Sequence, residues 1–126
     1  MLIKGRGTGP PIYKSYPDNS KRTDRKAKAR GDVPVFLLNT DKIKDTVFHA
    51  LGRETPGRRY VHIPKWIPER FIEELVAEER SADGKWKKRS RGIRNESFDL
   101  FVYCWACLYE LGADTLAWAN PPPWAV

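Results

Sequence analysis

Asp99 is the residue of this sequence best placed to do chemistry. It sits one turn into a segment, residues 96–111, whose side chains are otherwise nearly all apolar. A carboxylate in such surroundings is costly unless it is paired, close to water or bound to a metal. A structural explanation is also open, because the helix dipole favours acids near a helix N-terminus by roughly 0.3–1 kcal/mol.

Two polar residues beside Asp99 extend the candidate site. Asn95 lies four residues earlier, so the two side chains share one helical face and could point at one bound ion. Asn95 is most simply an N-cap, and Glu96 is most simply a partner of the helix dipole. His62 lies on an apolar run before Pro64, where a histidine is more often a structural hydrogen-bonding group than a site residue.

The two cysteines of the chain, Cys104 and Cys107, form a CxxC pair within an apolar run. A structural zinc site takes four ligands, typically with a second close pair, and only two histidines accompany these cysteines. We therefore expect both to be small buried hydrophobic side chains. The glycine-rich segment 5–9 lacks the Gly-Lys-Ser/Thr ending of a phosphate-binding loop, which argues against nucleotide hydrolysis.

The charge of the chain, formally +7, favours a polyanionic partner, and nucleic acid is the usual one. Basic residues concentrate at 21–30 and 85–94, where they would suit phosphate contacts or simply face solvent. Trp86, inside the second stretch, could stack on a base or anchor its loop. No apolar run reaches the ~18 residues of a membrane span and the start is no signal peptide, so we expect a cytoplasmic protein without a membrane partner.

The elements that must position these residues follow from apolar spacing and turn signals. A strand stub at Leu2-Ile3 precedes a Gly/Pro turn, and the polar, basic segment 14–31 predicts a loop. A buried strand is expected at 33–38. An amphipathic helix should then begin at Asn39-Thr40-Asp41 and end at Gly52.

The second half of the chain predicts a strand at 60–64, a helix at 68–80 and a last helix from Asn95 to about Leu111. Because the last helix is apolar almost all round, we expect it to be buried on every side. Residues 113–126 form a Pro/Trp-rich tail. Alternating strands and helices predict an α/β fold with a partly parallel sheet, and the short stub suggests that N-terminal strands are missing.

The order of the motifs is more specific than any one of them. The motifs are Lys4-Gly5 after the strand stub, Asn39-Thr40-Asp41 before Lys44, the run 60–64, F-I-E-E-L-V-A-E at 71–78, and R-N-E-S-F-D at 94–99. Over residues 2–112 this series resembles the C-terminal part of the endonuclease domain of phage terminase large subunits of the GpA, lambda-like type. The departures are modest, such as Ile63 where the family often has Phe.

This resemblance implies a ribonuclease-H-like α/β nuclease fold that uses Mg²⁺ or Mn²⁺. The third metal-binding acid of the family lies at the start of its last helix, which carries the catalytic, metal-binding role over to Asp99. The first two acids lie upstream of the Lys-Gly strand and have no counterpart here, so we expect an incomplete fold that is inactive as an isolated fragment. Asp41 and Asp45 are weak substitutes, since Asp41 also suits a helix start.

The implied partners are double-stranded DNA and, in the full-length protein, the terminase small subunit and the portal, in the cytoplasm of a bacterial host. Candidate DNA-binding residues are Lys4, Lys44, Lys85, Lys87, Lys88, Arg89, Arg91 and Arg94. Asn95, Glu96 and His62 are candidates for a supporting role around Asp99. The alternatives are a non-catalytic basic DNA-binding module and a prophage remnant.

Overall fold

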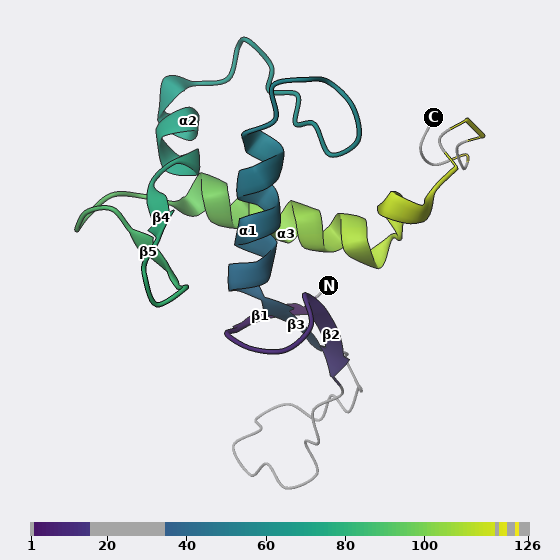
Figure 1. The fold of residues 1–126 in the computed structure, drawn as a ribbon, viewed down its shortest axis with the longest axis horizontal. Coiled ribbons are helices and arrows are strands. Elements are labelled where there is room, and N and C mark those ends of the chain that lie inside the picture. Colours follow the sequence, from purple (N-terminus) through teal and green to yellow (C-terminus); the bar gives the residue numbers. More distant parts are fainter. Residues whose placement is uncertain (1, 16–34, 118, 121–122, 124–126) are drawn as a thin grey trace, which may run out of the picture.

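A small mixed sheet forms the N-terminal part of the computed structural model, which describes residues 2–15, 35–117, 119–120 and 123 (Figure 1). Strands β1 (Leu2–Arg6), β2 (Ile12–Ser15) and β3 (Val35–Asn39) lie in the order β1-β3-β2. β1 runs parallel to β3 and β2 antiparallel, which confirms the partly parallel sheet of an α/β fold. Within the predicted loop 14–31, residues 14 and 15 belong to β2, and 16–31 lie outside the described residues.

Helix α1 (Thr40–Leu51) follows β3 directly and ends at Gly52, as the sequence predicts. The buried Asn39 makes this connection rigid. Its Oδ1 accepts from the backbone N–H of Lys42 at 3.2 Å, and its Nδ2 donates to the Gly9 carbonyl at 2.9 Å. One side chain therefore caps the helix and also fastens the turn between β1 and β2, which satisfies groups that would otherwise lack partners.

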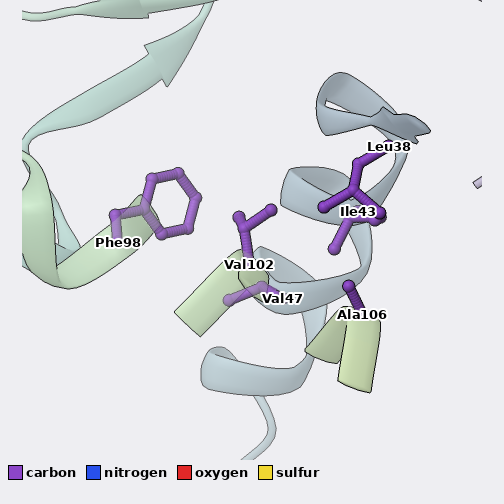
Figure 2. Packing of buried hydrophobic residues seen from close by; sticks show 6 residues of the cluster. All are labelled: Leu38, Ile43, Val47, Phe98, Val102 and Ala106. Carbon is purple, nitrogen blue, oxygen red and sulfur yellow. The ribbon is translucent and has the colours of Figure 1, made fainter. Parts of the chain in front are cut away.

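The core lies between α1 and α3 (Glu96–Glu110), which cross one another (Figure 1). Apolar side chains at helical spacing in α1 meet apolar side chains of α3, and Leu38 of β3 closes the cluster (Figure 2). Its fully buried members are Leu38, Ile43, Val47, Phe98, Val102 and Ala106. Packing of these two helices fixes the start of α3 beside α1, which is where the candidate site forms.

Two predicted elements of the second half are wrong in the structure. Residues 60–64 form no strand: Arg59 has a left-handed backbone (φ 63°) and Pro64 ends the segment, so the run pairs with no described strand. The predicted helix 68–80 stops early, as α2 (Glu69–Leu75), and the chain then forms β4 (Glu78–Arg80).

The β4–β5 hairpin replaces the end of that helix. β4 pairs antiparallel with β5 (Trp86–Lys88), and the turn between them places Gly84 at φ 75°. The backbone N–H of Ser81 donates to the Lys85 carbonyl at 2.8 Å across this turn. Asp83-Gly84 is a strong hairpin signal, and here it outweighs the helical spacing of the preceding residues.

α3 has the predicted limits, but it is not buried on every side. Its Phe98–Val102–Ala106 face packs against α1, whereas the opposite face is exposed. The exposed apolar or sulphur-containing residues are Leu100, Tyr103, Cys104, Cys107, Leu108 and Leu111. The expectation of buried cysteines is therefore wrong, because both lie on the exposed part of α3 and outside the cluster that packs against α1. Of the tail, residues 113–115 form the 3₁₀ helix η1 (Ala113–Thr115).

Candidate active site

Lys44 of α1 lies between two carboxylates that come from distant parts of the chain. Its Nζ is 2.6 Å from Glu78 Oε2 of β4 and 3.1 Å from Asp99 Oδ1 in the first turn of α3. The side chains of Lys44 and Glu78 are 11% and 4% exposed, whereas that of Asp99 is 41% exposed. The ammonium thus offsets a buried and a half-exposed negative charge at once, and the opening to solvent is at Asp99.

Asn95 joins the two carboxylates from the other side. Its Nδ2 donates to Asp99 Oδ2 at 3.1 Å and also to Glu78 Oε1. Asn95 occupies the N-cap position of α3, but its side chain does not cap the helix as predicted. Asn95 and Asp99 lie on one helical face, as the sequence predicts, and there they bond to each other.

Glu74 of α2 caps α3 in place of Asn95. Its buried Oε2 accepts from the backbone N–H of Ser97 at 3.0 Å and from Ser97 Oγ at 2.7 Å. The hydrogen bond from the Ser97 hydroxyl lowers the pKa of Glu74, and the charge of Arg94 adds to this effect. Because Glu74 supplies the acceptor at the helix start, the Asn95 amide can turn toward Lys44 and the two acids.

Asp41 and Asp45 position the β4–β5 hairpin against α1. Trp86 Nε1 donates to Asp45 Oδ1 at 2.9 Å, and Arg80 Nη1 is 2.6 Å from Asp45 Oδ2. The indole ring also packs against Phe98, with ring centroids 5.4 Å apart. The backbone N–H of Trp86 donates to Asp41 Oδ1 at 3.3 Å, so both acids of α1 bind the hairpin that also carries Glu78.

The remaining predicted site residues lie outside this cluster. Glu96 pairs with Arg94, whose Nε donates to Glu96 Oε2 at 3.1 Å. His62 is exposed, and its ring packs against Tyr60 with centroids 4.8 Å apart. Exposed bases occupy β1 and the segment from the hairpin turn onward, at Lys4, Lys85, Lys87, Lys88, Arg89 and Arg91. The basic stretch 21–30 lies outside the described residues.

With this geometry established, comparison with known proteins assigns the family. A family model for the endonuclease domain of the terminase large subunit gpA matches residues 1–118. This chain belongs to the gpA terminase endonuclease family. No curated protein and no solved structure gives a match. The family associates the chain with phage DNA packaging, and within the described residues no helix is long and apolar enough to cross a membrane.

Glu78 is the residue of this candidate site that the sequence pattern did not single out. The predicted helix 68–80 includes Glu78, and nothing in that helical pattern distinguishes it from the neighbouring acids. Its place as the last acid of F-I-E-E-L-V-A-E, five residues before Asp83-Gly84, was the available signal. In the hairpin Glu78 and Glu79 point to opposite sides, and Glu78 is the buried one.

The fit of the cluster to a divalent ion can be judged from its lone pairs. Carboxylate oxygens suit hard cations such as Mg²⁺ and Mn²⁺. Both oxygens of Glu78 accept from Lys44 and one also from Asn95, whereas the half-exposed Asp99 retains lone pairs toward solvent. The described residues contain no group of three or more potential metal-binding side chains. The described residues therefore fit a divalent ion that Asp99 would bind as one ligand, with other groups supplying the remaining ligands.

Proposed function

We propose that the chain is part of a metal-dependent DNA endonuclease domain with a ribonuclease-H-like fold, and that Asp99 is its metal-binding carboxylate. One observation carries the proposal: Lys44, Glu78, Asn95 and Asp99 converge from three elements on a single hydrogen-bonded cluster. A carboxylate that remains open to solvent beside a buried ion pair can accept a further ligand. Family membership supports the reaction class, phosphodiester hydrolysis in DNA.

Each residue of the cluster has a separate task in this proposal. Asp99 faces solvent and would bind Mg²⁺ or Mn²⁺, which in nucleases stabilises the charge that develops on the phosphate oxygens. Asn95 holds one Asp99 oxygen and Lys44 the other, so the rotation of the carboxylate is fixed. Glu78 holds the Lys44 ammonium from the buried side.

The basic side chains of the hairpin are proposed to bind the DNA backbone. Lys88 is the partner of Glu78 in the β4–β5 register, and Arg89 donates its backbone N–H to the Ala77 carbonyl at 3.0 Å. The exposed bases thus emerge from the same hairpin that carries Glu78 into the cluster. Phosphates bound there would lie beside Asp99, and their affinity should fall steeply with salt because bound counterions are released.

A non-catalytic DNA-binding module is the second candidate function. It is favoured by the burial of Glu78, whose oxygens already accept from Lys44 and Asn95, whereas Asp99 is the carboxylate of this cluster that faces solvent. One carboxylate is too few to hold two ions, so we propose that the chain alone does not cut DNA. The proposed protein partners are the small terminase subunit and the portal, which would act with this domain in the packaging complex in the cytoplasm of a bacterial host.

The test is an Mn²⁺ titration followed by electron paramagnetic resonance, together with plasmid cleavage in Mg²⁺ or Mn²⁺. We expect Mn²⁺ binding that Asp99→Asn abolishes and that Glu79→Gln, an exposed control on β4, preserves. We expect no cleavage by any of the three proteins. Unchanged Mn²⁺ binding in Asp99→Asn contradicts the metal site, and Asp99-dependent cleavage contradicts the proposed inactivity while supporting the nuclease.

A further inference from the structure

A pocket of about 690 Å³ opens far from the candidate active site. It is lined by residues 57–60, in the segment after α1, and by residues of the C-terminal half of α3 and of η1. Its volume is within the range of sites that enclose small molecules or single chemical groups. Nothing in the proposed nuclease chemistry uses this pocket.

One ion-pair network holds the mouth of the pocket in shape. Arg59 Nη2 is 2.6 Å from Asp114 Oδ2, and Arg58 Nη2 donates to the Asp114 backbone carbonyl at 3.3 Å. Arg59 has a left-handed backbone at φ 63°, which is uncommon for a residue with a side chain. The segment is thus held in an unusual conformation by its bond to η1.

The lining has two chemical features that together define a ligand. Tyr60, Trp105 and Tyr109 give it aromatic walls, which suit a planar group. Arg58 and Arg59 share one carboxylate, so the rim keeps a net positive charge, and the Arg58 side chain is 70% exposed. A ligand that is both planar and anionic satisfies both features.

We propose that this pocket binds an unpaired nucleotide of single-stranded DNA, with the base against the aromatic walls and the phosphate at Arg58. Base stacking on aromatic side chains beside basic groups is the general mode of single-strand binding. The choice of DNA over a free nucleotide rests on the proposed DNA-cleaving function. Lys65 and Trp66 follow Tyr60 by five and six residues in the same segment, and the Trp66 side chain is 78% exposed.

The test uses an oligothymidine that contains one 2-aminopurine, whose fluorescence is quenched when the base stacks. We expect quenching on binding to the full chain, and at least about tenfold weaker binding for Arg58→Glu, since one stacked base with its phosphate contributes on the order of tenfold or more. Arg53→Glu, the same charge change in the same segment but outside the pocket, should stay within about twofold. Tyr109→Leu should reduce the quenching.

The controls separate this proposal from the active-site proposal. Duplex DNA should bind Arg58→Glu as it binds the unaltered chain, because duplex contacts are assigned to the β4–β5 hairpin. Equal losses for Arg58→Glu and Arg53→Glu, or quenching unchanged in both Arg58→Glu and Tyr109→Leu, overturn the pocket. Thymidine monophosphate that binds as tightly as the oligonucleotide, or an acidic peptide that binds when the oligonucleotide does not, also overturns it. If Tyr109→Leu fails to fold by circular dichroism, the exposed Arg58 variant still decides.

Discussion

The ion pairs at the two ends of α3 differ in how far they are buried. At its N-terminal end, Lys44, Glu78, Asn95 and Asp99 form a network in which the ammonium and one carboxylate are almost fully buried. At its C-terminal end, Arg59 and Asp114 pair on the surface, with side chains 40% and 34% exposed. Charges removed from water depend on their partners far more than charges that remain hydrated. The first network should therefore be essential for the fold, and the second should adjust a local surface.

The largest expected effect comes from removing the shared cation of the buried network. Lys44→Met leaves Glu78 and Asp99 facing one another without compensation, and breaking a buried pair in this way costs about 3–5 kcal/mol. Urea denaturation should show this loss in the free energy of unfolding. Lys42→Met, an exposed change two residues earlier on α1, should stay within about 0.5 kcal/mol.

A second variant distinguishes lost compensation from lost packing at Lys44. In Lys44→Met/Glu78→Leu the buried carboxylate is also gone, so much of the stability should return, because an apolar pair can replace a buried ion pair. If Lys44→Met alone is as stable as the unaltered chain, the buried network is no more important for the fold than the exposed ion pair at the other end of α3.

An intermediate effect is expected at Glu74, which caps α3 beside the buried network. The folded state lowers the pKa of Glu74, so its contribution to stability is complete above the ordinary pKa of a glutamate. That contribution is lost as the pH falls through the lower pKa of the folded state. Glu74→Gln should therefore lower the urea midpoint at pH 7 by less than Lys44→Met does.

The pH dependence is the measurement that isolates the Glu74 charge. The difference between the unaltered chain and Glu74→Gln should be constant from pH 7 to about pH 5 and should shrink below the ordinary glutamate range, near pH 4. Glu73→Gln, an exposed neighbour, serves as the control for general acid effects. A difference that stays constant down to pH 3 would show that the carboxylate charge is not what caps the helix.

Local signals predicted those parts of the fold that depend on neighbours in sequence. Helix α1 and its Asn39 cap follow from apolar spacing and N-cap chemistry, and the limits of α3 follow from Asn95 and Gly112. The sequence did not predict the β4–β5 hairpin, because the apolar residues of 71–76 recur at helical spacing and that spacing does not show where the helix ends. The strand predicted at 60–64 failed because strand spacing does not reveal whether a partner strand is available.

The sequence predicted only part of the candidate site, because local spacing does not show which distant segments pack together. Asp99 and Asn95 lie four residues apart on one helix, so their pairing could be predicted from spacing. Lys44 and Glu78 reach the same cluster only through packing of α1 and the hairpin against α3, across sequence separations that no local pattern encodes. Glu74 belongs to this class too, since its capping of α3 depends on where α2 packs.

The smallest expected effect is at the C-terminal end of α3. Asp114→Asn removes the carboxylate shared by Arg58 and Arg59, but exposed ion pairs contribute about 0–1 kcal/mol and are screened by salt. The loss of unfolding free energy should be within this range in low salt and should vanish in 1 M NaCl. For Lys44→Met, by contrast, most of the loss should persist in the same salt, because the side chains of Lys44 and Glu78 are buried. If Asp114→Asn destabilised the chain as much as Lys44→Met, the left-handed backbone at Arg59 would be a structural requirement of the fold, and the two ends of α3 would be equivalent.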